Sequence, residues 1–187
     1  MKWIGERISF VDEKEVCTIV IYPKRQNIIN GLMGAWLAMW LVIGGVTFWS
    51  FSTFKFTDQE SIILFVFLVF WAYYAWKVIK SFMWLMWGKE LIKINDSFFI
   101  YKKSIKNYGK ANSYFIENIE KIRVYQPKPN SFQSAWESSP WIQGGERIEF
   151  DYQNKLIRVG RKLDEKDTQQ LFKFITKKIE DRLKKLK

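Results

Sequence analysis

The chain of 187 residues has no histidine and a single cysteine, Cys17. A disulfide within the chain is therefore excluded, and so are a zinc site of the usual Cys and His type, a Ser-His-Asp triad and a Cys-His dyad. A glycine-rich phosphate loop is also missing, because Gly144-Gly145 is too short and does not open a helix. We therefore expect no catalytic residues, no metal and no cofactor, and we expect that the protein is not an enzyme.

Four carboxylates lie near one another in the C-terminal part of the sequence. Asp164, Glu165 and Asp167 stand at the start of a helical pattern, where acidic residues cap the helix and interact favourably with its dipole. Asp151 lies in a segment typical of a strand. Capping explains the first three residues without any role in catalysis.

Charge is absent from a long stretch in the first third of the chain. No charged residue occurs from Gln26 to Phe54, and such a stretch measures about 40 Å as a helix, against about 30 Å of bilayer hydrocarbon. We predict a membrane-spanning helix at about 29–51. A signal peptide is the alternative, but the stretch starts far from Met1, is too long for an apolar h-region and lacks a convincing cleavage site.

A second apolar stretch follows a short polar connection. Residues 61–76 carry no charge and measure about 24 Å as a helix. The helical pattern continues past Lys77 and Lys80. A lysine near a helix end can extend its amine to the membrane interface, so these two charges are compatible with a membrane-spanning helix. We predict a second span at about 61–79, with its helix extended to residue 87. A buried core helix of a soluble domain is the alternative.

Basic residues flank both predicted spans on the same side. The positive-inside rule then places both termini in the cytoplasm and the short connection, which contains Lys55, on the outer side. The predicted location is the cell membrane, with two spans. The flanking basic residues are Lys2, Arg7, Lys14, Lys24 and Arg25 before the first span, and Lys89, Lys93, Lys102, Lys103 and Lys106 after the second.

Small residues recur along the first predicted span at near-helical spacing. They are Gly31, Gly34, Ala38 and Gly45. Small side chains let a neighbouring helix approach closely. That neighbour is either the second span of the same chain, or another subunit or membrane protein.

The remaining sequence consists of short runs typical of β-strands, followed by one helix. Residues 89–187 form the main part, with turn signals between the runs and an amphipathic helix at 164–186. Residues 1–27 contain two more β-rich pieces, which we expect to add a hairpin to the same sheet. The predicted fold class is α+β, with a transmembrane helical hairpin at 28–88 inserted into an antiparallel sheet domain. The expected strands after the spans are 91–94, 97–105, 113–116, 121–125, 146–152 and 155–160.

An unusual segment lies between Pro127 and Gly145. Its prolines, glycines, serines and asparagines indicate a long loop, yet it also carries four apolar residues. Long loops with apolar tips are often functional, so these residues form a candidate partner-binding loop. The alternative is that the rings fold back onto the sheet or onto the headgroup region. The four residues are Phe132, Trp136, Trp141 and Ile142.

The order of these elements is similar to that of a known group of proteins. The stretch IVIYPK precedes the spans, and WGKELIKI, FFIYKK, YFIENIEKIRVY, GGERIEFDY and IRVGRKLDEKD follow them. This order resembles uncharacterised bacterial membrane proteins with a two-helix transmembrane hairpin and a pleckstrin-homology-like domain. The resemblance implies a strongly bent antiparallel sheet or partly open barrel, capped by the C-terminal helix, at a bacterial inner membrane, and it implies no enzyme activity.

Domains of this fold bind phosphoinositides in some proteins and peptides or proteins in others, so the fold does not fix the ligand. The phosphoinositide motif has clustered basic residues that end in arginine. Here Lys102 and Lys103 are followed by Ser104, and we do not expect phosphoinositide binding.

Together these observations favour a membrane-anchored module that binds a protein or peptide partner, or associates with itself, at the cytoplasmic face. An alternative is a module that senses anionic lipids, since residues 89–187 carry 22 Lys and Arg against 13 Asp and Glu. A further alternative is a subunit of a small homo-oligomeric channel. Nucleic acid is not an expected partner. The candidate headgroup contacts are Lys77, Lys80, Lys173, Lys177 and Lys184.

Overall fold

The computed structural model describes residues 1–24, 27–128, 130–139, 141 and 144–186. The chain forms two compact units. The sheet unit comprises Met1–Lys24, Trp87–Ser139 and Gly144–Lys187, and the helix unit comprises Arg25–Met86 together with Pro140–Gln143.

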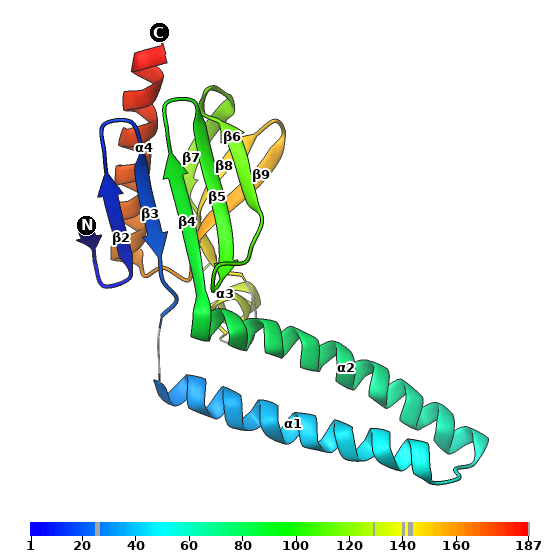
Figure 1. Cartoon of the computed structure of the whole chain (residues 1–187). Coiled ribbons are helices and arrows are strands. Elements are labelled where there is room, and N and C mark those ends of the chain that lie inside the picture. The colour runs from blue at the N-terminus through cyan, green and yellow to red at the C-terminus, as the bar shows by residue number, and fades with distance from the viewer. Residues whose placement is uncertain (25–26, 129, 140, 142–143, 187) are drawn as a thin grey trace. The chain divides into compact units, whose positions relative to one another are not determined.

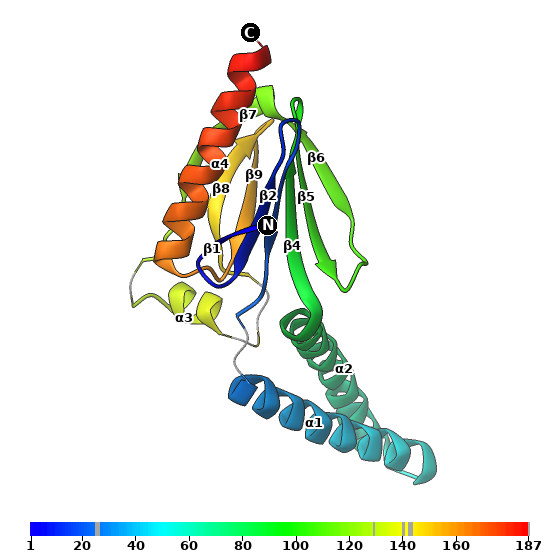
Figure 2. The same cartoon turned by 60° about the vertical axis from the view of Figure 1, so that its left-hand side comes forward.

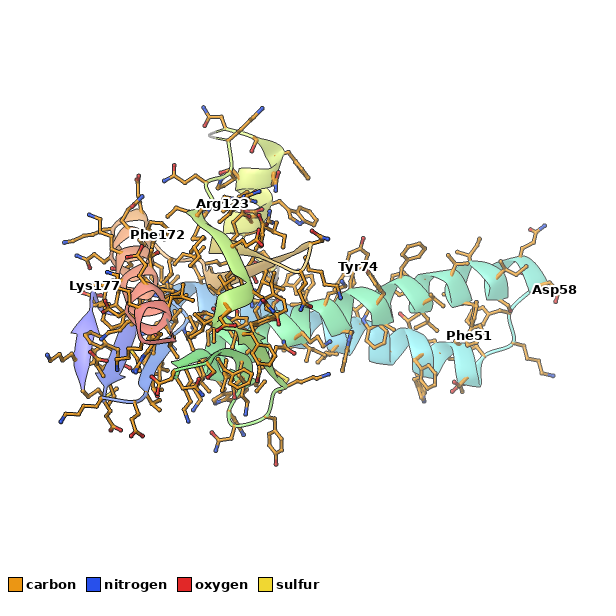
Figure 3. The ribbon with its side chains drawn as sticks, turned by 90° about the horizontal axis from the view of Figure 1, so that it is seen from above. Phe51, Asp58, Tyr74, Arg123, Phe172 and Lys177 are labelled. Carbon is orange, nitrogen blue, oxygen red and sulfur yellow. The ribbon has the colours of Figure 1, made fainter. Side chains whose placement is uncertain are left out.

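The helix unit consists of two long apolar helices, α1 (Asn27–Thr53) and α2 (Asp58–Trp87). They lie side by side and are joined at one end by a short connection (Figure 1). Phe51, near the end of α1, and Asp58, at the start of α2, lie at this connected end (Figure 3). Both helices are long and apolar enough to cross a membrane, and few residues of their apolar stretches are buried inside the structure.

Small residues and tryptophans form the contact between α1 and α2. A Cβ atom placed on Gly34 would lie 3.5 Å from the ring of Phe82, whereas one on Gly44 would lie 1.8 Å from the ring of Trp71. Added Cβ atoms on Gly31 and Gly45 would meet nothing within 4 Å. The sequence pattern therefore identified Gly34 correctly as a packing residue. It selected Gly45 where the structure uses its neighbour Gly44, which lies about 100° away around the helix.

Six antiparallel strands form the larger sheet of the sheet unit, in the order β1-β2-β3-β4-β5-β6. The central pair is formed by β3 and β4, where Cys17 lies opposite Ile94 and Ile21 lies opposite Glu90. In the sequence, the helix unit is therefore inserted between two strands that are neighbours in one sheet. The strands are β1 (Lys2–Ile4), β2 (Ile8–Asp12), β3 (Cys17–Ile21), β4 (Gly88–Ile94), β5 (Phe98–Ile105) and β6 (Ala111–Phe115).

Three further antiparallel strands form the second sheet, in the order β7-β8-β9. A one-turn 3-10 helix, η1 (Ile116–Asn118), connects β6 to it. The hairpin between β8 and β9 turns at Gln153 and Asn154, which both have positive φ angles, as a tight two-residue turn requires. The strands are β7 (Ile119–Val124), β8 (Glu146–Tyr152) and β9 (Lys155–Arg161), and a short helix, α3 (Phe132–Ser138), lies between β7 and β8.

The C-terminal helix α4 (Glu165–Leu186) packs on β1, β7, β8 and η1. Figure 2 shows it lying along the strands of the sheet unit. Its apolar stripe, which includes Leu171, Ile175 and Ile179, joins inward residues of both sheets in one core. Phe174 adds a ring contact with Phe10 of β2, at 4.6 Å between centroids.

The structure confirms the prediction of an α+β protein with two long apolar helices and antiparallel strands. Three local predictions differ. The first β-rich piece is divided into β1 and β2 by a turn at Gly5, which has φ +59°, and an added Cβ there would lie 2.2 Å from the Asp167 carboxylate. The predicted long loop contains α3. The C-terminal helix begins at Glu165, one residue later than predicted.

Candidate functional site

The candidate partner-binding loop contains a seven-residue helix, α3, with a polar cap. Ser131 precedes the helix in extended conformation, and its hydroxyl accepts a hydrogen bond from the Ser134 amide at 3.1 Å. This bond satisfies one of the amides that a helix start leaves unpaired. The serines that suggested a loop in the sequence thus start a helix.

Phe132 and Trp136 form an exposed aromatic pair on α3. They are four residues apart and therefore lie on one face of the helix. Their ring centroids are 5.5 Å apart, and the residues are 79% and 52% exposed. The two large rings in contact with each other form a small exposed apolar patch on α3.

A polar network attaches α3 to the end of β7. The Gln133 amide donates a hydrogen bond to the Tyr125 hydroxyl at 2.7 Å and another to Glu137 at 3.0 Å. Tyr125 in turn donates to Glu137 at 3.3 Å, and its ring lies 4.3 Å from the Arg158 guanidinium carbon. Arg147 on β8 lies 4.0 Å from the second Glu137 oxygen. These contacts hold the adjacent face of α3, so the aromatic pair does not depend on its own burial for its position.

Lys162 supports the end of the same segment. Its amine donates a hydrogen bond to the Ser139 carbonyl, which directly follows α3. The Lys162 backbone amide donates to the Gly145 carbonyl at 2.7 Å. Burial, together with the neighbouring Arg161 charge, lowers the pKa of Lys162 to about 8. Lys162, which directly follows β9, therefore bonds to this segment at two points, Ser139 and Gly145.

An open groove of about 420 Å³ lies beside α3. Tyr125, Pro127 and Ser134 line one part of it, and Leu163, Glu165 and Thr168 line another. The groove thus runs from the end of β7 to the first turn of α4. It combines apolar surface with carboxylates and hydroxyls, which suits an extended polypeptide better than a small apolar ligand.

The structure assigns Trp141 to a different unit from Phe132 and Trp136 of the predicted site. Trp141 belongs to the helix unit, where its ring packs edge-on against Trp36 at 4.9 Å between centroids, next to Met33 and Leu37. Ile142 lies outside the described residues. The candidate binding surface therefore consists of Phe132, Trp136 and the neighbouring groove, whereas Trp141 is used for packing.

The predicted headgroup lysines have two kinds of surroundings. Lys77 and Lys80 lie over the rings of Tyr73 and Trp76, at 5.3 Å and 5.1 Å from the centroids. Lys173, Lys177 and Lys184 are exposed on α4, on the same helical face as Lys166. Lys177 and Phe172 of α4 are labelled in Figure 3. In contrast, Lys178 and Arg182 form ion pairs with Asp12 and Asp96.

Sequence reasoning missed Glu90 on β4, which at 1% exposure is the most deeply buried charged residue among those that the structure describes. Its carboxylate accepts hydrogen bonds from the amides of Gly160 at 2.8 Å and Arg161 at 3.0 Å, so a side chain of the large sheet satisfies backbone donors of β9. Glu90 lies on the same, buried face of β4 as Ile92 and Ile94, because side chains alternate between the two faces of a strand. This alternation was the sequence signal that could have identified Glu90 as buried.

Arg7 complements Glu90 at the same end of β9. Its guanidinium donates to the carbonyl of Lys162 at 2.6 Å, to that of Arg161 at 3.3 Å and to that of Tyr22 at 3.0 Å. The Glu90 carboxylate therefore accepts hydrogen bonds from backbone amides, while the Arg7 guanidinium donates hydrogen bonds to backbone carbonyls. These two charged side chains close the junction between the sheets.

Burial governs the titration of the groups at this junction. Burial raises the pKa of the Glu90 carboxyl, and the charge of Lys103 opposes this increase. Burial also raises the pKa of Tyr101, and the negative charge of Glu90 raises it further. Glu90 and Tyr101 are both closed off from solvent. We assign this pair to the stability of the sheet unit.

Three of the four carboxylates singled out in the sequence have structural partners. Asp151 lies 3.5 Å from Arg123, and Asp164 lies 3.3 Å from Lys24. Glu165 accepts a hydrogen bond from Gln126 at 3.4 Å. Within the described ranges, no three His, Cys, Asp or Glu side chains are grouped so that they could hold a metal ion.

The chain matches no known family model, and it matches no curated protein and no solved structure.

Proposed function

We propose that this protein is a membrane-anchored interaction module without enzyme activity, which binds a protein or peptide partner at the cytoplasmic face. In this proposal α1 and α2 cross the bilayer, and the sheet unit is a pleckstrin-homology-like domain. The binding surface is the aromatic pair Phe132 and Trp136 with the groove beside α3.

The surface of the helix pair supports the membrane anchor. Large apolar side chains along both helices are exposed, including Leu32, Val42, Ile62, Phe65 and Phe70. Soluble proteins rarely expose apolar patches of this extent, whereas a bilayer provides the matching solvent. Lys77 and Lys80 fit the same picture, because both lie over interfacial aromatic rings toward the end of α2.

The arrangement of the sheet unit supports the resemblance to a pleckstrin-homology-like fold. Antiparallel strands form two sheets around one core, and the amphipathic helix α4 at the end of the chain covers part of that core. The fold alone does not name a ligand. The binding role rests instead on the surface around α3.

The observation that carries the proposal is the exposure of the contacting Phe132 and Trp136 rings on a helix that polar contacts hold in place. Aromatic residues at the centre of an interface often supply most of its binding energy. A pair that is already ordered also loses little conformational entropy when a partner binds. The groove next to the pair provides room for the rest of a polypeptide.

The test compares full-length protein purified from membranes in mild detergent with a variant that carries Phe132→Ser and Trp136→Ser. We expect a recurring protein partner with the wild type and at least about a tenfold lower recovery with the variant, which corresponds to the loss of one interface anchor. Leu156→Ser is the matched control, because Leu156 is an exposed apolar residue on β9 of the same unit. Equal recovery with wild type and the double variant would overturn the assignment of the binding surface.

A photo-crosslinker at position 136 separates a protein partner from lipid. Protein adducts at this position, which are absent from position 156, are the expected result. Adducts formed with lipid alone would instead favour the headgroup region as the neighbour of α3.

A further inference from the structure

Four lysines lie at or near the turn between β5 and β6, next to the start of β4, the strand that follows α2. Lys89 comes from β4, Lys102 from β5, and Lys106 and Lys110 from the turn itself. We name these four residues the lysine cluster. No aspartate or glutamate occurs from Ser97 to Ile116, and no member of the lysine cluster forms an ion pair within the described part of the chain.

Two of the amines converge on one residue of the turn. Lys102 donates a hydrogen bond to the Asn107 carbonyl at 3.0 Å, and Lys89 donates to the Asn107 side-chain oxygen at 3.5 Å. An ammonium group has three donors, so each amine keeps further N–H groups for an acceptor outside the protein. Neutral oxygens hold the two charges in place without neutralising them, which leaves a positive site.

The backbone of the turn is fixed. Ile105 and Tyr108 exchange backbone hydrogen bonds at 2.9 Å and 3.1 Å, and the Ser104 hydroxyl donates to the Lys106 carbonyl at 3.0 Å. Gly109 allows the close approach, because an added Cβ there would lie 2.0 Å from the Lys103 carbonyl oxygen. Tyr108, which closes this turn opposite Ile105, is 85% exposed.

The turn is also bonded directly to the last residue of α2. The Lys106 amide donates to the Trp87 carbonyl at 2.9 Å, and the Lys106 amine lies 5.2 Å from the centroid of the Trp87 ring. Trp87 lies about 15 Å farther along α2 than Lys77, the residue at which the predicted membrane interface begins. The headgroup layer is roughly 5–8 Å thick on each side, and charges act over a Debye length of about 8 Å in physiological salt. The lysine cluster therefore lies within reach of the membrane surface from which α2 emerges.

We propose that the lysine cluster binds the headgroup phosphates of anionic phospholipids in the leaflet at the C-terminal end of α2, with Tyr108 as an interfacial contact. Charge complementarity and the bond to Trp87 select this occupant, because an anionic membrane surface attracts basic residues beside a spanning helix. The proposal rests on the membrane anchor of the proposed function but not on the partner-binding surface.

The experiment uses the full chain in nanodiscs of equimolar phosphatidylglycerol and phosphatidylcholine, and native mass spectrometry then counts each lipid retained on the released protein. Lys89→Gln, Lys102→Gln, Lys106→Gln and Lys110→Gln are combined in one variant. The matched control changes the same number of charges on the exposed face of α4, with Lys166→Gln, Lys173→Gln, Lys177→Gln and Lys184→Gln.

We expect wild type and the α4 variant to retain phosphatidylglycerol in preference to phosphatidylcholine, and the cluster variant to reduce this preference by about threefold or more. A combined Lys106→Glu and Lys110→Glu variant should reduce it as well, while the contacts of Lys89 and Lys102 with Asn107 remain. An unchanged preference in the cluster variant, or an equal loss in the α4 variant, would overturn the site. Release of the wild type from membranes by alkaline carbonate would overturn the membrane anchor itself, which distinguishes that failure from a failure of the lysine cluster.

Discussion

Trp40 and Trp71 exchange hydrogen bonds across the helix pair. The Trp71 indole donates to the Trp40 carbonyl at 2.9 Å, and the Trp40 indole donates to the Trp71 carbonyl at 3.4 Å. Each ring therefore satisfies its N–H on the backbone of the other helix. The Trp71 ring can lie this close because Gly44 has no side chain.

Gly44→Leu should destabilise the helix pair, because its side chain would occupy the space of the Trp71 ring. Overpacking of this kind costs about 1–3 kcal/mol or more. Thermal unfolding in detergent, followed by near-UV circular dichroism, measures the loss. Gly45→Leu is the control, since an added Cβ at Gly45 meets nothing within 4 Å. Equal melting temperatures for the two variants would contradict the packing described here.

Glu90→Leu should destabilise the sheet unit, because it leaves the buried amides of Gly160 and Arg161 without their acceptor. The expected loss is about 2–4 kcal/mol in the free energy of unfolding. Lys24→Gln provides the contrast, since it removes an ion pair with exposed Asp164 and should cost less than about 1 kcal/mol. Chemical denaturation of both variants in the same detergent measures the difference, and similar losses would argue against the proposed role of Glu90.

Cys17 should react slowly with N-ethylmaleimide until the protein unfolds. Its side chain is fully buried on β3, and burial raises the pKa of the thiol to about 11 from 9.0, with a smaller contribution from Asp12. The thiolate is the reactive form, so few molecules react at neutral pH. Labelling in native detergent and in sodium dodecyl sulfate, followed by mass spectrometry, compares the two states. Fast labelling of the native protein would show that β3 is open to solvent.

The same thiol makes a pH-dependent contribution to stability. Because the folded protein binds the thiol proton more tightly than the unfolded chain does, this contribution is fully present below pH 9 and is lost as the pH rises through about 11. Cys17→Ala should therefore show a smaller decrease in stability than the wild type over this interval. Parallel curves for the two proteins would contradict the raised pKa.

Membrane topology provides a further prediction. In a background with Cys17→Ala, a cysteine that replaces Lys55 should react with a membrane-impermeant maleimide on intact cells, because Lys55 lies in the connection between the spans. A cysteine that replaces Tyr108 should react only after the membrane is opened, although this side chain is highly exposed. The opposite labelling pattern would invert the predicted orientation.

The features that were predictable from the sequence are those set by local periodicity. Long uncharged stretches indicated α1 and α2, and alternation indicated most of the strands. The short helix α3 was not predicted, because its residues are typical of a loop and its fixed position depends on distant partners such as Arg147 and Lys162. The choice of Gly44 over Gly45 depends on how the two helices face each other, which periodicity along one helix does not specify.

The candidate site was predictable in part, for the same reason. Phe132 and Trp136 were identified by composition, but the sequence did not show that Trp141 packs on Trp36 in the other unit. The lysine cluster was also missed. Its members come from β4, β5 and the turn, and only pairing of those strands brings them together.

The pairing of β3 with β4 also sets an order for biosynthesis. The first three strands leave the ribosome before either helix, yet the strand opposite Ile21 begins only after α2 has been made. The first strands must therefore wait, without their sheet neighbour, until the whole helix pair has been synthesised. A folded sheet unit therefore requires that the intervening helices have been completed, and premature termination within α1 or α2 leaves the edge of β3 unpaired and open to pairing with another chain.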